Sequence, residues 1–139
     1  TVFELARFLD GIRELAGLGP AARLNIALKA ASKTAEVGEV VIRQGDKAEH
    51  LYFLRSGRCA VTQRNDAGAE NEIGEILPGQ AFGEIGLMLR QPRMATVTCS
   101  ENSSFVEVSA MVLEHALRES FHVGLALETL AGRRLGSEK

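Results

Sequence analysis

The sequence FGEIGLMLRQPRMATV, residues 82–97, places one carboxylate and one guanidinium on either side of a short apolar turn. Gly83 has no side chain, so its backbone can approach a ligand closely and adopt a positive φ. The apolar run that follows is too short for a separate surface helix and suits a single helical turn. The N-terminus of such a turn presents unpaired N–H groups, which favour an anion. Arg93 adds a planar fork for two phosphate oxygens, so this stretch predicts a site for a phosphate ester.

The carboxylate of Glu84 has a different role in this prediction. An ionised carboxylate only accepts hydrogen bonds, so it suits a hydroxyl and not a phosphate. A ribose hydroxyl next to a phosphate supplies that combination. The competing interpretation is a surface loop in which Glu84 and Arg93 form an incidental ion pair, worth at most about 1 kcal/mol. The clustered glycines, the apolar turn and the spacing of the two charges favour the binding site.

Composition narrows the class of protein. The chain has 139 residues, of which 45% are hydrophobic and 24% are charged, as in an ordinary globular domain. The net charge is −2 and no basic cluster stands out, so nucleic acid is not an expected partner. No apolar stretch approaches the ~18 residues of a membrane-spanning helix. The composition, rich in Ala, Gly and Arg, indicates a bacterial source.

The cysteines and histidines predict neither a disulfide nor a metal site. Cys59 and Cys99 lie in strand-like apolar runs and are expected to be small core residues, as in a reducing cytosol. His50, His115 and His122 lack metal-ligand spacing. A cupin-type metal enzyme or a metal-dependent phosphodiesterase needs clustered metal ligands, and no nucleophile–base pair is visible. We therefore expect no catalytic residues.

The hydrophobic pattern predicts helices, then many short strands, then helices. Helical spacing over residues 5–15 predicts a first helix that stops at residues 17–20. A second helix is expected from Pro20 to about Ser32, with one apolar face made of Leu24, Ala27, Leu28 and Ala31. Strands are expected at residues 40–42, 51–54, 59–62, 72–77, 95–99 and 105–108, with a hairpin tip at residues 65–68.

Two further helices are expected at the C-terminal end. Ser109 is the predicted N-cap of the first, and Ser120 is the predicted N-cap of a second that runs to residue 136. Strands this short, at this spacing, are typical of a sandwich or barrel. The predicted fold class is therefore mainly β: a β jelly-roll barrel with N-terminal helices and two C-terminal helices.

Residues 82–97 resemble the phosphate-binding cassette of cyclic-nucleotide-binding domains, in which Phe-Gly-Glu is followed by Pro-Arg and then Ala-Thr-Val. Such domains occur in protein kinase A regulatory subunits, cyclic-nucleotide-gated channels and catabolite-activator-like regulators. The turns and strands of residues 38–57 are also similar to this family, and the resemblance covers roughly residues 22–135. It implies a cyclic-nucleotide-binding domain at residues 20–136 after an N-terminal helical extension at residues 1–19.

The resemblance also implies the site. Glu84 would hold the ribose 2′-OH, while Arg93 and nearby backbone N–H groups would hold the cyclic phosphate. The expected ligand-binding residues are Gly83, Glu84, Ile85, Gly86, Leu87, Arg93, Met94 and Ala95. The last helix would act as a lid, with Leu127, Leu130, Arg133 and Arg134 as candidate contacts to the base. For the two lid arginines, a solvated helix end is an equally good interpretation.

One position bears on the choice of nucleotide. Many cGMP-preferring members carry Thr or Ser directly after the phosphate arginine, where the hydroxyl meets the guanine amino group. Met94 occupies this position here and cannot form that hydrogen bond. The resemblance therefore implies a preference for cAMP over cGMP, and no cofactor besides this ligand.

The expected function is that of a regulatory sensor, not an enzyme. Nucleotide binding would move the C-terminal helices and signal to an effector in the same or an associated chain, such as a channel, transporter or enzyme. A cytoplasmic location is expected, as a free protein or as the cytoplasmic domain of a membrane protein, without direct membrane contact. Oligomer formation is left open. The alternative is a degenerate domain that keeps the fold and serves as a protein-interaction or structural module without ligand.

Overall fold

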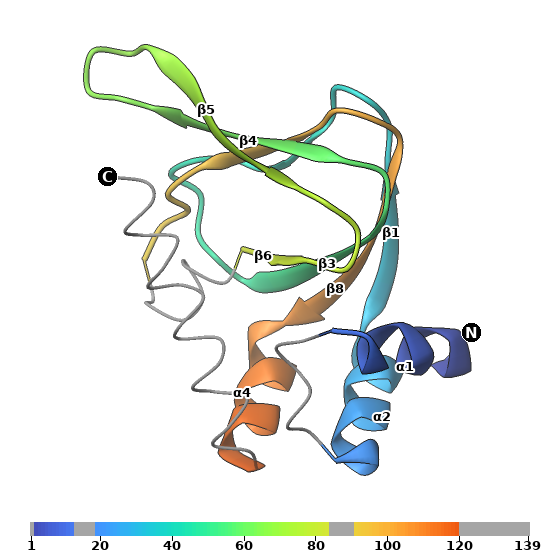
Figure 1. The fold of residues 1–139 in the computed structure, drawn as a ribbon. Coiled ribbons are helices and arrows are strands. Elements are labelled where there is room, and N and C mark those ends of the chain that lie inside the picture. The colour runs from blue at the N-terminus through green and yellow to red at the C-terminus, as the bar shows by residue number, and fades with distance from the viewer. Residues whose placement is uncertain (1, 13–18, 84–90, 120–139) are drawn as a thin grey trace.

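The computed structural model describes residues 2–12, 19–83 and 91–119. Two antiparallel sheets enclose a barrel, and the helices gather at one end of it (Figure 1). The described helices are α1 (Val2–Asp10), α2 (Pro20–Lys29) and α4 (Ala110–Glu119). The described strands are β1 (Ala31–Ala35), β2 (Val40–Ile42), β3 (His50–Ser56), β4 (Cys59–Arg64), β5 (Glu70–Ile76), β6 (Ala81–Phe82), β7 (Thr96–Cys99) and β8 (Ser103–Ser109).

Strands distant in sequence lie side by side in both sheets. One sheet has the order β1-β8-β3-β6 and the other has the order β2-β7-β4-β5. Every strand pairing among the described residues is antiparallel, so the predicted mainly β barrel with flanking helices is confirmed. The pairing of β3 with β6 brings Phe82, the first residue of the cassette, against Tyr52.

The strands of the first sheet separate two hydrophobic cores. Leu51 and Phe53 of β3 pack with the helices, whereas Leu54 packs with the opposite sheet inside the barrel. In β8, Val106 likewise packs with the helices, and Phe105 packs inside the barrel. This alternation follows from the two-residue period of a strand. The sheet therefore supports the helices on one face and lines the barrel interior on the other.

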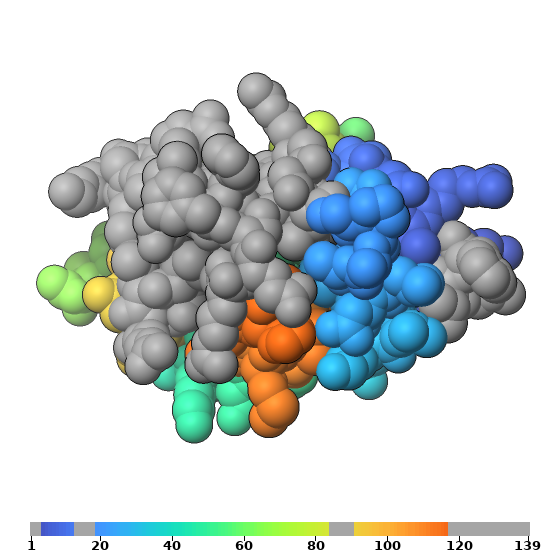
Figure 2. Space-filling model, turned by 90° about the horizontal axis from the view of Figure 1, so that it is seen from below, coloured from blue at the N-terminus to red at the C-terminus, as the bar shows by residue number. Residues whose placement is uncertain are grey.

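The helices cover the first sheet at one end of the barrel. α1 packs against α2, and α4 lies beside α2, as the view from below shows (Figure 2). The Ser109 hydroxyl accepts a hydrogen bond from the Val112 N–H at 3.3 Å, so the predicted N-cap of α4 is confirmed. The predicted second C-terminal helix lies outside the described residues.

The predicted second helix was too long. α2 ends at Lys29, because the extended backbone of Ala30 directs the chain into β1. Residues 31–35 pair with β8, and this tertiary pairing outweighs the helical preference of alanine. The predicted apolar face was right only in part: Ala27 is buried as predicted, together with Ile26, whereas Leu24 and Leu28 are exposed.

The predicted first helix also ends earlier than expected, at Asp10, where a turn at Gly11 follows. Glycine disfavours a helix interior, which explains this end. Leu5, Leu9 and Ile12 are nevertheless buried together in the core beneath the first sheet. The proposed boundary between residues 19 and 20 stays a prediction.

Candidate functional site

Two residues of the predicted site meet at the edge of the barrel, although ten positions separate them. Gly83 directly follows β6, and Arg93 lies three residues before β7. Gly83 has a φ of +86°, in the left-handed region that favours glycine. A Cβ atom at this position would lie 2.8 Å from Nη1 of Arg93. The absent side chain of Gly83 therefore makes room for the guanidinium.

The Arg93 side chain is buried, with 7% of its surface exposed. Nη1 donates a hydrogen bond to the Gly83 carbonyl at 2.6 Å, and Nη2 donates to the His50 carbonyl at 2.7 Å. A buried cation is stable only when its N–H groups have partners, and these two carbonyls provide them. The guanidinium is thus positioned by the main chain of β3 and by the main chain of the residue that follows β6.

The backbone of Arg93 is also held in place. Its N–H donates to the Asp46 carbonyl at 2.7 Å, and its carbonyl accepts from the Gly45 N–H at 2.7 Å. Gly45 has a φ of +93°, so this turn depends on glycine as well. The turn before β3 therefore fixes the main chain of Arg93, and β3 together with Gly83 fixes its side chain.

The ring of Tyr52 lies beneath the guanidinium, with Cζ of Arg93 6.0 Å from the ring centroid. Tyr52 in turn stacks on Phe82, and the two ring centroids lie 5.2 Å apart. Burial raises the pKa of Tyr52, the negative charge of Glu107 raises it further, and the positive charge of Arg93 lowers it. A cation over an aromatic face is favourable, so Tyr52 is a second support for Arg93.

Met94 and Ala95 follow Arg93 and are half-buried. The side-chain amide of Gln63 in β4 donates a hydrogen bond to the Met94 carbonyl at 3.1 Å. The hydroxyl of Thr96 accepts a hydrogen bond from the Gln44 N–H at 3.0 Å. The segment from Arg93 into β7 is therefore held by β4 and by the turn that follows β2.

The sequence comparison agrees with this geometry. Residues 32–120 match the model of the family described as the cyclic nucleotide-binding domain. This chain belongs to the cyclic nucleotide-binding domain family. It is 38% identical to the cAMP-dependent protein kinase type II regulatory subunit of Drosophila melanogaster over 64% of its own length. The match covers 23% of that protein, so the chain spans less than a quarter of the length of this curated relative.

Solved structures share the fold of this cyclic nucleotide-binding domain. The regulatory domain of Toxoplasma gondii PKA, co-crystallised with cAMP, has a TM-score of 0.86 at 18% identity, covering 97% of this chain and 50% of that chain. The regulatory subunit of a cAMP-independent protein kinase A from Trypanosoma cruzi, bound to guanosine, has a TM-score of 0.82 at 22% identity. That match covers 91% of this chain and 43% of the other. At these identities the likeness shows the fold alone.

Eight of the twelve predicted site residues lie outside the described residues of the domain. The structure describes Gly83, Arg93, Met94 and Ala95. The predicted residues outside it are Glu84, Ile85, Gly86, Leu87, Leu127, Leu130, Arg133 and Arg134. Their roles stay predictions.

Sequence reasoning missed the supports of Arg93. His50 acts through its carbonyl group, which no sequence pattern reveals, because every residue carries one. Tyr52 was recognised only as part of a strand. Gly45 and Asp46 belong to a stretch that resembles the family, which was the available signal for their importance.

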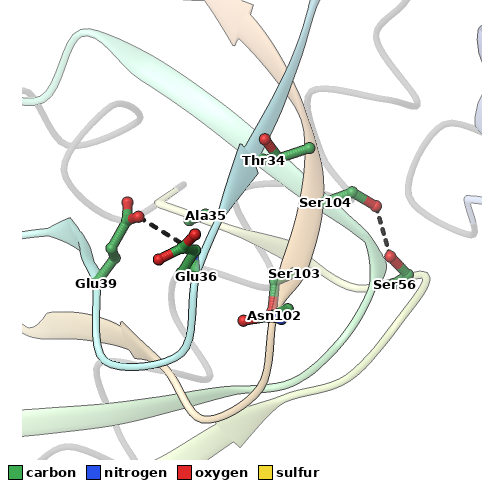
Figure 3. A pocket seen from close by; sticks show the side chains of 8 residues that line it. All are labelled: Thr34, Ala35, Glu36, Glu39, Ser56, Asn102, Ser103 and Ser104. Carbon is green, nitrogen blue, oxygen red and sulfur yellow. Dashed lines mark hydrogen bonds between the residues drawn. The ribbon is translucent and has the colours of Figure 1, made fainter.

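A separate hollow of about 470 Å³ opens near the far end of β3 (Figure 3). Its lining residues are Thr34, Ala35, Glu36, Glu39, Ser56, Asn102, Ser103 and Ser104. Ser56 and His50 lie at opposite ends of β3, roughly 20 Å apart at ~3.3 Å per residue. The hydroxyls of Ser56 and Ser104 bond each other at 2.6 Å, and a carboxylate oxygen of Glu39 accepts from the Glu36 N–H at 3.2 Å. Two carboxylates make this hollow unsuitable for an anion.

The cysteines of the domain are buried and free, as predicted. Cys59 and Cys99 lie directly opposite each other in β4 and β7. Burial raises the pKa of Cys59 from 9.0 to about 12, with a further contribution from Cys99. Within residues 2–12, 19–83 and 91–119, no group of metal-binding side chains is present. The same part of the chain contains no helix long and apolar enough to span a membrane.

Proposed function

We propose that this chain is a regulatory sensor module that binds a cyclic nucleoside monophosphate, with cAMP preferred over cGMP. The observation that carries this proposal is the buried guanidinium of Arg93, which the main chain holds at the predicted phosphate position. A charge-assisted hydrogen bond contributes about 1.5–3 kcal/mol. Two or three such bonds together with burial of the base account for affinity near micromolar, which requires roughly 8 kcal/mol.

The preference for cAMP rests on Met94. Its thioether cannot donate a hydrogen bond or replace the hydroxyl of Thr or Ser beside a guanine amino group. The Drosophila melanogaster and Toxoplasma gondii relatives are proteins of cAMP-dependent signalling, which supports cAMP as the first ligand to test. The guanosine-bound Trypanosoma cruzi relative makes a nucleoside without phosphate the second ligand to test.

The proposed output is movement of the C-terminal helices after nucleotide binding. α4 packs against β3 and β8, the two strands that carry His50, Tyr52 and Glu107 near Arg93. A change at the phosphate position therefore has a short route to α4. The energy available for this movement is the difference in nucleotide affinity between the two states. The effector and the cytoplasmic location are part of the same proposal.

Calorimetric titration of the chain with cAMP, cGMP and guanosine tests the proposal. We expect micromolar or tighter binding, with cAMP stronger than cGMP and with no measurable binding of guanosine. Tighter binding of cGMP would contradict the Met94 argument while keeping the sensor function. Absence of binding to all three would favour the degenerate interaction module.

A further inference from the structure

Three polar side chains lie in the barrel beside the buried arginine. Tyr52 in β3 lies directly opposite Glu107 in β8. Leu54 and Phe105, each two residues away along these strands, belong to the core inside the barrel. Because side chains two residues apart share a face, Tyr52 and Glu107 also face the barrel interior. His50, two residues before Tyr52, lies on the same face.

These side chains are in contact with one another. Nε2 of His50 lies 3.7 Å from Oε1 of Glu107. The charge of Glu107 and a hydrogen-bonding interaction with its side chain both raise the pKa of Tyr52, and the His50 and Tyr52 ring centroids lie 6.3 Å apart. Arg93 joins the cluster over the Tyr52 ring and through its hydrogen bond to the His50 carbonyl. Tyr52 thus lies between a buried cation and a carboxylate.

The charges around this cluster depend on one imidazole. Glu107 approaches from β8 and its side chain is 19% exposed, so solvent screens its charge only partly. The other described charges near His50 are Arg93 and the Glu49–Lys47 pair just before β3, with a separation of 4.0 Å and largely exposed side chains. Protonated His50 would neutralise Glu107, whereas neutral His50 leaves that carboxylate facing the phosphate position.

We propose that Glu107 restrains anion binding at Arg93 and that protonation of His50 relieves this restraint, with Tyr52 joining the pair to the guanidinium. This inference rests on the proposed function, because it concerns the regulation of the same site. A cyclic phosphodiester keeps its single negative charge at neutral and mildly acidic pH. Any change of affinity in that range therefore reports on the protein.

The expected change in nucleotide affinity follows from Coulomb attraction between the protonated His50 and the bound anion. The His50 ring centroid lies 6.3 Å and Cζ of Arg93 lies 6.0 Å from the Tyr52 ring centroid. The two groups therefore lie within roughly 12 Å of each other, a range at which Coulomb interactions still act. A unit charge at this range, partly screened, changes an anion's affinity roughly 3- to 10-fold. Nucleotide binding is therefore expected to strengthen by this factor between about pH 8 and pH 6, where an imidazole gains its charge.

The experiment is a cAMP titration of the native chain and four variants across this pH range. His50→Gln removes the titrating group, and Glu107→Gln removes the charge but keeps an acceptor for the Tyr52 hydroxyl. His115→Gln, on the exposed side of α4, and Glu75→Gln, in β5, are matched controls. We expect a flat pH profile for His50→Gln, and tighter binding with a flatter profile for Glu107→Gln, while both controls keep the native profile. An unchanged profile in His50→Gln and Glu107→Gln would overturn the inference.

A second readout does not need nucleotide. The chain has one tyrosine and no tryptophan, so the absorbance of ionised tyrosine reports on Tyr52 alone. Glu107→Gln is expected to lower the pKa of Tyr52, and circular dichroism verifies that each sample stays folded. If cAMP does not bind to the native chain, the proposed function fails. This titration still tests whether the charge of Glu107 acts on Tyr52. A Tyr52 pKa that is the same in the native chain and in Glu107→Gln would overturn it.

Discussion

Gly83 brings the backbone of the cassette into direct contact with the side chain of Arg93. Its φ of +86° disfavours other residues, and its missing Cβ leaves space for Nη1 of Arg93. Gly83→Ala is expected to displace the guanidinium, weaken cAMP binding at least tenfold and lower the free energy of unfolding by about 1–3 kcal/mol. Gly79→Ala is the control, because Gly79 has a φ of +90° and no atom within 4 Å of an added Cβ. Calorimetry and denaturant unfolding of both variants measure these effects. Equal loss of binding in both would contradict the role of Gly83.

Arg93 itself is best tested with lysine. A lysine keeps the positive charge but offers no planar fork, so it cannot hold two phosphate oxygens and two carbonyls together. Arg93→Lys is expected to weaken cAMP binding by roughly 10- to 100-fold, which corresponds to one charge-assisted hydrogen bond. A glutamate would face the carbonyl oxygens of Gly83 and His50, so Arg93→Glu mixes loss of binding with loss of stability. Native affinity in folded Arg93→Lys would show that the phosphate binds elsewhere.

At the scale of elements, the turn between β3 and β4 has the tightest packing around any glycine that the structure describes. A Cβ added at Gly57, where φ is +96°, would lie 2.6 Å from the Asn102 carbonyl oxygen and 2.7 Å from Cα of Ser103. These atoms belong to the residue before β8 and to the first residue of β8, so the turn packs against a distant part of the chain. Gly57 therefore sets the course of the chain where it passes from β3 in one sheet to β4 in the other.

Gly57→Ala is accordingly expected to cost more stability than a change at an open turn. The expected loss in free energy of unfolding is about 3 kcal/mol or more, since backbone strain and overpacking add. Gly38→Ala, with a φ of +90° and no neighbour within 4 Å, should cost about 1 kcal/mol. Urea unfolding curves compare the two variants. Similar midpoints would show that the segment before β8 can move aside.

At the scale of the whole molecule, the two free cysteines that lie opposite each other in β4 and β7 report on global unfolding. Cys59 and Cys99 are 0% and 2% exposed, in the core between the two sheets. Only the thiolate reacts, and burial raises the pKa of Cys59 to about 12. We expect both thiols to react with an alkylating reagent at the rate of unfolding. Fast reaction of the folded chain would contradict this burial.

The same shift predicts alkaline destabilisation. Cys59 keeps its proton in the folded state while the unfolded thiol ionises near pH 9.0, so the unfolded state binds fewer protons above that pH. The free energy of unfolding is therefore expected to be unaffected by this group below pH 9 and to fall as the pH rises toward about 12. Tyr52, whose pKa is raised from 10.0, acts in the same direction at higher pH. Thermal unfolding measures this effect: between these pH values, the stability of the native chain should fall more steeply with pH than the stability of Cys59→Ala.

Local chemistry made much of this protein predictable. The Ser109 cap, the hairpin tip at residues 65–68 and the strands other than β1 and β6 depend on neighbouring residues, so sequence reasoning located them. The cassette was recognisable because its glycines and charges occur at a regular spacing within a few residues.

The supports of the site required the three-dimensional arrangement. The carbonyls of His50 and Gly83 meet Arg93 only because β3 pairs with β6, and Glu107 reaches Tyr52 only because β8 pairs with β3. The end of α2 and the start of β1 likewise depend on the pairing of residues 31–35 with β8. Hydrophobic period and turn residues encode local structure, whereas register between distant strands is set by the packing of the whole barrel.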